Sequence, residues 1–442
     1  MITRDDIESM IPQDGERLTE YDVVVAGGGP AGIGAALASS MNGAETLILE
    51  GRSFFGGVAQ VALWMPVNQI MRDGDKRGGV HDSFVAKVKS LGPDAWVKGK
   101  EDWINQDGLD IHPEYLRLAL FELFEEAGCH YRLYSSVTDT LTEGNTVKGV
   151  VTTGKDGPQD FRARIVIDAT GDGDVAYHAG AEMASGREDD GIHMPVSLVF
   201  AICNADEDRF FDFYLDSKEE FQAVIDQAEK EGYHTAAWYG FDRTTVPGAI
   251  SVNNGALRGI GDLDGCKSQH LTIAERMGLL VAVDFIKLAR AKKIPGLNKC
   301  SLMRTGSAVG VRDTRRIVGE YVQTVEDARG GAEFADIVAR KYGAIDANQL
   351  FTGTMKSGFA YPYRSLLPKR IENLLMAGRC ASATFMGHAS GKSMGNMMGL
   401  GQAAGVAAAL CCKREVTPRE LDVKELQQKL TEMGVALFDS NP

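Results

Sequence analysis

Short runs of apolar residues near the start of this chain of 442 residues predict two buried strands. Residues 23–26 (VVVA) and 46–49 (TLIL) are continuous and bounded by polar or glycine positions, as is typical of strands covered on both faces of a parallel sheet. Ala-rich helical sequence lies between them, and Asn42 and Gly43 end it. The pattern therefore predicts a complete strand–helix–strand unit.

Glycines in this unit predict a dinucleotide site. Gly27, Gly29 and Gly32 fit G-x-G-x-x-G, and Glu50 closes the second strand 23 positions after Gly27. The first glycine permits a tight turn, the second lets the backbone approach a pyrophosphate, and the third lets helix and strand pack closely. The helix start offers N–H groups to phosphates, and the acid can bind a ribose 2′-OH. A glycine-rich turn without a ligand is the alternative, and the complete unit disfavours it.

Beyond residue 60, the pattern of apolar and polar residues indicates three further regions. Residues 113–127 predict an amphipathic helix with proline at its first position. Alternating strands are expected near residues 130–137, 146–153 and 160–167, and they resemble a small antiparallel sheet. Residues 61–111 look irregular, and we interpret them as an excursion that covers the cofactor.

These patterns predict an α/β protein with three segments. Residues 18–190 are expected to form the first part of a dinucleotide-binding domain, residues 191–358 a substrate domain of mixed α and β structure, and residues 359–442 the second part with a C-terminal helix. The last segment contains a Gly/Ala-rich helix that ends near residue 410, and an amphipathic helix over residues 421–437.

Composition restricts the partners and the compartment. The net charge of −14 argues against nucleic acid or an anionic membrane surface as a partner. The seven cysteines have no metal-binding spacing, so no metal is expected. The simplest interpretation is that they are reduced thiols in a cytoplasmic protein. No stretch of 18 apolar residues exists, and the first twenty residues do not have the pattern of a signal peptide. A homo-oligomer is compatible with the sequence.

Three separated segments resemble the flavoproteins with two dinucleotide-binding domains. They are GGGPAG at residues 27–32 with its acid, IDATGDGDVA at 167–176, and LLMAGRC at 374–380 followed by GQAAGVAAA at 401–409. The motifs GVRDTRRIVGE (310–320) and YPYRSLLPK (361–369) resemble those of an FAD-dependent oxidoreductase family. The resemblance covers nearly the whole chain and implies a discontinuous, Rossmann-like FAD-binding domain with an inserted α+β substrate domain.

The resemblance also implies which residues contact FAD. Val137 would reach the adenine through its backbone, and residues 396–398 at a helix start would present N–H groups to the flavin. The family often has arginine at the position of Lys392, so the active-site face of the flavin is expected to be unusual. The complete set of expected cofactor contacts is Gly27, Gly29, Pro30, Ala31, Gly32, Glu50, Gly51, Arg52, Gly56, Gly57, Val137, Ala169, Thr170, Gly171, Gly378, Arg379, Asn396, Met397 and Met398.

Four residues are candidates for the chemistry. Arg312 and Arg364 lie in the two family motifs, and an arginine fork can hold a carboxylate through two hydrogen bonds. His388 lies between a strand and the flavin-facing helix, where an acid or base is needed. Tyr361 is a candidate for lining the pocket. For each residue a purely structural role is the alternative, with arginines pairing the chain's acids and the histidine bonding within a loop.

The leading functional hypothesis is FAD-dependent transfer of a hydride between flavin N5 and a small polar or anionic molecule. The partner that supplies or removes the electrons is not identified by the sequence. A flavin-dependent monooxygenase is the first alternative, although no second dinucleotide fingerprint for a nicotinamide donor is visible. A non-redox flavoprotein, such as an assembly partner or a lyase, is the second.

Overall fold

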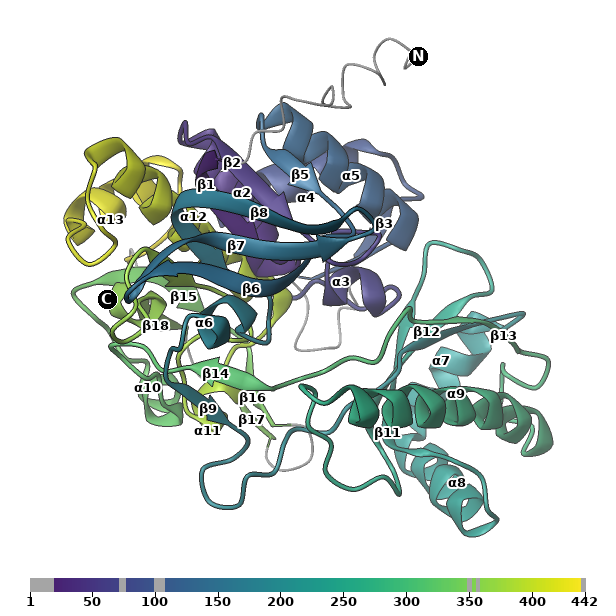
Figure 1. Ribbon diagram of the computed structural model, residues 1–442. Helices are drawn as coiled ribbons and strands as arrows, with labels where there is room; N and C mark the ends of the chain where they lie inside the picture. The colour runs from purple at the N-terminus through teal and green to yellow at the C-terminus, as the bar shows by residue number, and fades with distance from the viewer. Residues whose placement is uncertain (1–19, 71–76, 99–107, 348–351, 355–357, 439–442) are drawn as a thin grey trace.

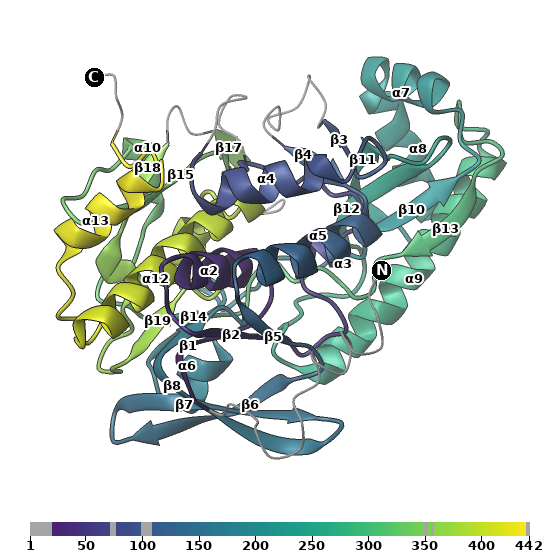
Figure 2. The same cartoon turned by 90° about the horizontal axis from the view of Figure 1, so that it is seen from above.

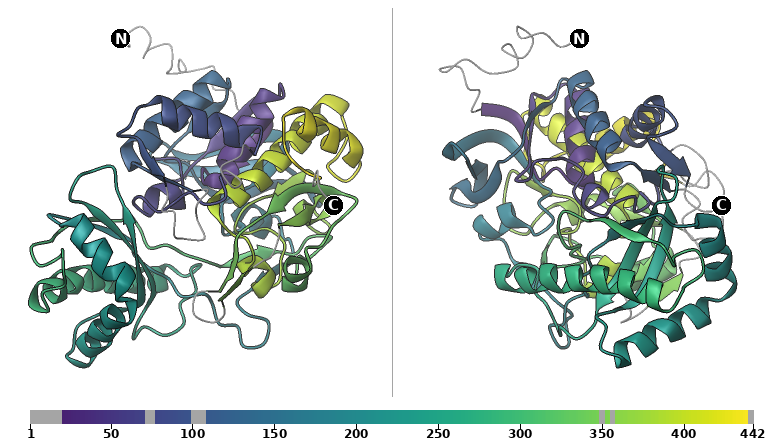
Figure 3. Two further views of the ribbon diagram at one scale, coloured as in Figure 1. Left: turned by 180° about the vertical axis from the view of Figure 1, so that it is seen from behind. Right: turned by 90° about the vertical axis from the view of Figure 1, so that its right-hand side faces the viewer.

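The computed structural model describes residues 20–70, 77–98, 108–347, 352–354 and 358–438 (Figure 1). Residues 1–19, 71–76, 99–107, 348–351, 355–357 and 439–442 lie outside the described residues. The expected start of the first segment at residue 18, the expected end of the last at residue 442 and part of the expected excursion fall on them. Figure 3 shows two bodies, a large one around the main sheet and a smaller one of α and β elements beside it.

A seven-stranded sheet organises the large body. Strands β5 (His130–Arg132), β2 (Thr46–Leu49), β1 (Glu20–Ala26) and β8 (Gly157–Asp168) are parallel neighbours in that order. The end of β8 also pairs in parallel with β19 (Leu374–Met376), which comes from the last fifth of the chain. The predicted strand–helix–strand unit is confirmed, and the sheet joins both ends of the chain as expected for a discontinuous domain.

The expected antiparallel strands are an extension of this sheet. The first half of β8 pairs with β7 (Thr146–Gly154), which pairs with β6 (Ser136–Glu143). Figure 2 shows this extension on the side of the sheet opposite the main helices, with the short helix α6 (Asp174–His178) against it. The expected antiparallel pairing is confirmed for β6, β7 and the first half of β8. It is wrong for residues 130–132, because β5 pairs in parallel with β2, and all these strands belong to one sheet.

Helices α2 (Pro30–Met41) and α12 (Met394–Arg414) cross at close range on one face of the sheet (Figure 2). A Cβ on Gly401 would lie 2.7 Å from the carbonyl carbon of Ala31, and one on Gly405 would lie 2.9 Å from that of Ala35. Glycine is therefore required at both positions for the two backbones to approach. Nearly every residue of α12 is buried, so it is the central helix of the large core.

Helices α4 (Val80–Ser90) and α5 (Pro113–Glu126) complete this layer, and α3 (Val58–Val61) and the hairpin β3 (Trp96–Lys98) with β4 (Leu109–Ile111) lie nearby. The helix expected from residue 113 is confirmed. The irregular interpretation of residues 61–111 is wrong at α4, whose buried residues Val80, Phe84 and Val88 recur at helical spacing. The final helix α13 (Val423–Glu432) is shorter than expected.

The smaller body contains a four-stranded antiparallel sheet. Its strands are β11 (Ala236–Arg243), β12 (Ile250–Leu257), β10 (Phe200–Cys203) and β13 (Ser301–Thr305), in that order. Helices α7 (Glu207–Asp216), α8 (Lys218–Lys230) and α9 (Ser268–Ala291) pack with it around an aromatic core. This core is separate from that of the large body.

A third set of short elements lies against the large body and carries the family motifs. It comprises β9 (Met183–Ser185), β14 (Arg315–Ile317), α10 (Val325–Gly330), β15 (Ile337–Lys341), β16 (Ala344–Asp346), β17 (Thr352–Thr354), β18 (Phe359–Pro362), the short 3-10 helix η1 (Tyr363–Leu366) and α11 (Phe385–Ala389). Strand β15 pairs with β18 and so joins residues on both sides of the expected boundary at residue 358, which stays a prediction.

Candidate functional site

The carboxyl ends of four parallel strands meet at one edge of the large sheet. Ala26 of β1 is level with Leu49 of β2 and with Asp168 of β8, which is level with Met376 of β19. The loops that follow these strands therefore gather at that edge, which is where open α/β sheets bind ligands. They contain most of the cofactor contacts expected from the sequence.

The first loop has the geometry that its glycines predict. Gly27 has φ of 102°, and a Cβ there would lie 2.7 Å from the carbonyl carbon of Ala169 in the neighbouring loop. The Gly28 N–H donates to Oε2 of Glu50 at 2.9 Å, and the Arg52 N–H donates to Oε1 at 2.8 Å. These bonds fix the orientation of the carboxylate while each oxygen keeps a free lone pair for a further donor.

The second loop folds back over the first. The Gly56 N–H donates to the carbonyl of Gly28, and a Cβ on Gly57 would lie 2.8 Å from Cα of Gly29. Both Gly56 and Gly57 have positive φ. Residues 134–136 also return to this loop, because the Ser135 N–H donates to the carbonyl of Glu50. Val137 in β6 follows two residues after this contact with the backbone of the predicted ribose-binding acid.

The third and fourth loops are joined by an ion pair. Arg379 lies 2.9 Å from Asp172 and donates to the hydroxyl of Thr314 at 2.8 Å, and its guanidinium covers Gly171. Asp168 is fully buried and accepts from the N–H and hydroxyl of Thr170, and burial raises the pKa of this carboxyl to about 6. The two loops are therefore held as one rigid unit.

The start of α12 differs in detail from the expected contacts. The Met397 N–H already donates to the carbonyl of Ser393, and Met398 follows within the helix, so the N–H groups without an intrahelical acceptor belong to residues 394–396. Gly395 donates to the carbonyl of Asn68. Of the three residues expected from the resemblance, only Asn396 lies at this position, and its side-chain amide bonds the backbone of Tyr342.

Both helix starts at this edge are suited to a negatively charged ligand. Neither α2 nor α12 has a side-chain hydrogen bond at its N-cap or an acidic residue in its first turn, within the described chain. A helix start carries a partial positive charge and unpaired N–H groups, which favour phosphate or an electron-rich ring edge. Together with Glu50 and the close glycine turns, the edge therefore fits a dinucleotide cofactor.

Arg312 and His388 lie together beside this edge. Nε2 of His388 is 2.9 Å from the carbonyl oxygen of Arg312, so the proton of this tautomer is on Nε2. The imidazole is buried, and burial together with the charges of Lys392, Arg316 and Lys341 lowers the pKa of His388 well below its ordinary value. The histidine is therefore neutral and fixes the backbone of residue 312.

The Arg312 side chain forms a cationic cluster with Lys392. Its guanidinium lies 3.2 Å from Asp346, and its Nε is buried without a hydrogen-bond partner in the described structure. Nζ of Lys392 contacts the carbonyl of Asp346 and the sulfur of Met194. Burial lowers the pKa of Lys392 to about 8. In the described structure the cluster thus has two cations, with the carboxylates of Asp346 and of the buried Asp313 near them.

The other arginines of the motifs are engaged elsewhere. Arg315 pairs with Asp174, and the buried Arg316 donates to the carbonyls of Gly186 and Ala383. These contacts agree with the alternative given above, in which the arginines have purely structural roles. Arg364 lies over the ring of Tyr321 with 46% of its side chain exposed, 3.7 Å from Asp336. The structure therefore brings Arg312 and His388 together and leaves Arg364 apart.

Tyr361 is fully buried, and its hydroxyl has no hydrogen-bond partner within the described residues. Burial raises the pKa of Tyr361, so its phenol is neutral. Its ring contacts Lys341, a buried lysine that sequence reasoning missed, because IVARK in residues 337–341 has the composition of an ordinary strand end. No local signal in the sequence could have identified it.

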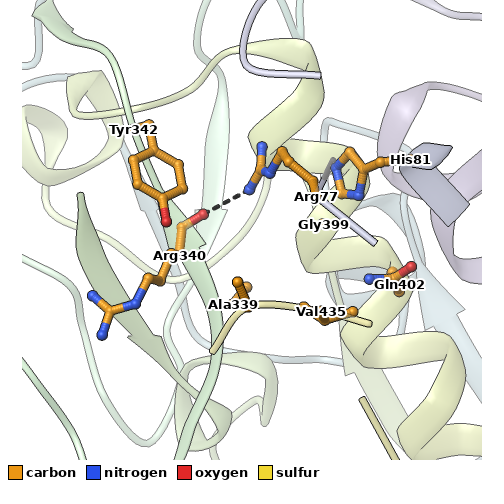
Figure 4. Close-up of a pocket in the computed structure, with 9 residues that line it drawn as sticks. Arg77, His81, Ala339, Arg340, Tyr342, Gly399, Gln402 and Val435 are labelled. Carbon is orange, nitrogen blue, oxygen red and sulfur yellow. Dashed lines mark hydrogen bonds between the residues drawn. The ribbon is translucent and has the colours of Figure 1, made fainter. Parts of the chain in front are cut away.

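A small cavity lies beside α12 (Figure 4). It has a volume of about 30 Å³ and is lined by Arg77, His81, Ala339, Arg340, Tyr342, Gly399, Gln402, Val435 and Ala436. A space of that size holds roughly two water molecules. Arg77 donates across it to the carbonyl of Arg340 at 2.9 Å and also bonds Asn396, so it braces the start of α12. The cavity is too small for a substrate.

Two features are absent from the described residues. These residues contain no group of three or more His, Cys, Asp or Glu side chains placed to hold a metal ion. They also contain no helix with the length and apolar character needed to cross a membrane.

Comparison with known proteins identifies relatives of this chain. The model of the family described as FAD dependent oxidoreductase matches residues 22–430. Digeranylgeranylglycerophospholipid reductase 2 of Methanopyrus kandleri is 34% identical over 154 residues, which are 34% of this chain and 38% of that protein. The 4-oxocyclohex-2-ene-1-carboxylate 5-dehydrogenase of Sinomonas cyclohexanicum is 31% identical over 102 residues, 22% of this chain and 15% of that protein.

Among solved structures, a geranylgeranyl bacteriochlorophyll reductase-like protein from Thermoplasma acidophilum is similar, with a TM-score of 0.48 and 14% identity. The similarity covers 93% of this chain and 83% of that chain.

Proposed function

Because the chain belongs to the FAD dependent oxidoreductase family, we propose that it is a dehydrogenase or reductase of a small anionic organic molecule. FAD is its cofactor and supplies, when bound, a two-electron acceptor or donor that exchanges a hydride at N5. The protein then has to bind the cofactor, hold the substrate and manage protons.

Residues at the sheet edge would hold FAD. The turn at Gly27, Gly29 and Gly32 and the start of α2 would receive the pyrophosphate, and Glu50 would receive the ribose. Arg379, held over Gly171 by its pair with Asp172, would cover the middle of the cofactor. The free N–H groups at the start of α12 would stabilise negative charge on the reduced flavin.

The proposal of an anionic substrate is supported mainly by Nε of Arg312, whose hydrogen bond is not made within the described structure. This atom is buried without a partner among the described residues, while another nitrogen of the same guanidinium pairs with Asp346. An unmade hydrogen bond of a buried charged group is costly, so a ligand oxygen at Nε stabilises the site. A carboxylate is the group that an arginine edge binds through two parallel hydrogen bonds.

The proposal is tested by anaerobic bleaching of the bound flavin with a panel of small organic acids, each paired with its neutral amide. We expect one or more acids to bleach the flavin, or to reoxidise the chemically reduced protein, and the matched amides to fail. Bleaching by amides as readily as by acids would refute the anionic assignment. In a separate measurement in air, oxygen consumption that matches the formation of a hydroxylated product would instead support the monooxygenase alternative.

Variants of the two candidate arginines provide a matched pair. Arg312→Lys keeps the charge and loses the planar fork, so the KM for the acid should rise at least about tenfold, the equivalent of about 1.4 kcal/mol. Arg364→Lys is the control, because Arg364 is half-exposed and lies away from the cluster. An equal rise of KM in both variants would contradict the role of Arg312.

A further inference from the structure

Lys341 is buried although it ends an otherwise apolar strand. All five residues of β15 are buried, and Lys341 is 3% exposed. Its neighbours on the paired strand β18 are aromatic, with Nζ 4.6 Å from the ring centre of Tyr361 and 5.9 Å from that of Phe359. Within the described structure, Nζ has no hydrogen-bond acceptor and no carboxylate partner.

The polar and titratable groups around Lys341 come from β18, α11, α12 and β15 itself. Strand β18 contributes the neutral phenol of Tyr361, and α11 contributes His388, whose pKa is lowered partly by the charge of Lys341. The first turn of α12 contributes the uncharged amide of Asn396, and Arg340 on the same strand faces away to pair with Glu333. Among the described residues no carboxylate is paired with Lys341, while the carboxylate of Asp346 lies beside Arg312 and its backbone carbonyl contacts Lys392.

A buried ammonium without a counter-ion is unfavourable, so this environment favours the neutral amine. Burial lowers the pKa of Lys341 from 10.5 to about 7. Near neutral pH a large fraction of the protein therefore carries a free amine lone pair at this position, which is the state that a general base requires.

The position of Lys341 is fixed relative to the predicted flavin contact. Both backbone polar groups of Tyr342, the next residue, bond the side chain of Asn396 in the first turn of α12. A Cβ on Gly391 would lie 3.0 Å from Cβ of Lys341, so the chain that leads into α12 passes directly over it. Lys341 is thus tied to the helix start that would face the reacting part of FAD.

We propose that Lys341 is the residue that exchanges a proton with the substrate during the redox step. In the oxidative direction, the amine takes the proton of the substrate hydroxyl or amino group as the adjacent carbon loses a hydride, a hydrogen nucleus with its two bonding electrons, for which FAD would be the acceptor. A carbonyl or imine and the ammonium of Lys341 result, and reduction follows the same path in reverse. The inference rests on the proposed function and assigns the proton transfer that it leaves open.

His388 is less suited to this role than its place in the chain indicates. Its Nε2 proton is committed to the carbonyl of Arg312, and cations surround the ring. A histidine whose pKa lies well below the ordinary value is a weak base. It acts instead as a positioning residue that holds the backbone of the arginine.

The test compares the FAD-loaded parent with Lys341→Met, Lys341→Ala and the control Lys299→Met, which removes an exposed lysine. Lys341→Met should bind FAD and bleach at least about a hundredfold more slowly, and it should lose the limb of the pH–rate profile near pH 7. Added ethylamine should restore part of the rate to Lys341→Ala, which a structural role could not produce. Bleaching at the parental rate with the profile intact would overturn the proposal.

A second readout does not depend on turnover. If the buried amine loses its proton near pH 7, the midpoint of urea unfolding of the FAD-loaded Lys341→Met should exceed that of the parent at pH 6, and the difference should shrink as the pH rises toward 10. Lys299→Met should show no such trend, and an identical trend in both variants would overturn the proposal. Failure of every acid to bleach the parent would contradict the proposed function, while this readout still decides the protonation of Lys341.

Discussion

Replacement of Gly401 by alanine tests the packing that holds the cofactor-binding helices together. Gly401 lies in α12, where α2 crosses it, and a Cβ there would lie 2.7 Å from the carbonyl carbon of Ala31 and closer still to its oxygen. Real Cβ atoms essentially never approach a heavy atom within 3.0 Å. The obstacle is backbone, which cannot rotate aside, so the two helices must separate.

The cost can be estimated from this separation. A gap of about 1 Å forfeits about a quarter to a half of the dispersion attraction between each facing pair of atoms. Overpacking of a close-packed core lowers the free energy of unfolding by about 1–3 kcal/mol, and the higher helix propensity of alanine raises it by about 0.5–1 kcal/mol. The difference is a net loss centred on about 1 kcal/mol and reaching about 2.5 kcal/mol. Ala31 lies in the first turn of α2, so FAD should also be released at lower temperature.

Gly330→Ala is the matched control. Gly330 ends helix α10, has no positive φ, and nothing lies within 4 Å of the Cβ position. This variant should be as stable as the parent or slightly more stable. The measurements are urea unfolding and the temperature at which flavin fluorescence appears. If Gly401→Ala is as stable as Gly330→Ala and retains FAD equally well, the proposed close crossing of α2 and α12 is refuted.

Three further results are expected. Glu50→Gln should weaken FAD binding about tenfold to a hundredfold, because a charge-assisted hydrogen bond contributes about 1.5–3 kcal/mol, and unchanged affinity in a fluorescence titration would remove the ribose assignment. Lys341→Met should raise the free energy of unfolding by up to roughly 5 kcal/mol at pH 6, since the pKa falls by about 3.5 and each pKa unit corresponds to about 1.4 kcal/mol. Because the folded protein loses this proton near pH 7 and the unfolded chain near pH 10.5, the gain should decline between those values and vanish above them. His388→Asn should keep the limb of the pH–rate profile near pH 7, and loss of that limb would return the role of proton acceptor to His388.

The cofactor-binding unit could be predicted from the sequence because its constraints are local. The positive φ of Gly27 and the close approach of Gly32 to the turn leave glycine as the fitting residue, so the pattern records the geometry directly. The same holds for the buried runs of β1 and β2. Gly401 and Gly405 were visible as part of a Gly/Ala-rich helix, but their contact with α2 depends on a crossing that the sequence does not encode locally.

The catalytic side of the site could be predicted only in part. Arg312 and His388 were found from motifs, yet their contact through a backbone carbonyl requires α11 to pack against residues 310–316. Lys341 could not be found, because an alternating strand would expose one of its two basic residues. Both are buried here. Arg340 donates hydrogen bonds to Glu333 and to the carbonyl of Leu437, and Lys341 lies against the aromatic rings of β18.

The most direct test of the central claim is anaerobic stopped-flow bleaching by an identified acid with deuterium at its reacting carbon. Hydride transfer predicts that bleaching slows with deuterium, and that Arg312→Lys requires more of the acid to reach the same rate. For a reductase, the equivalent measurement is reoxidation of the chemically reduced flavin after deuteration at the transferred position. A flavin whose redox state stays unchanged while substrate is consumed would contradict the claim.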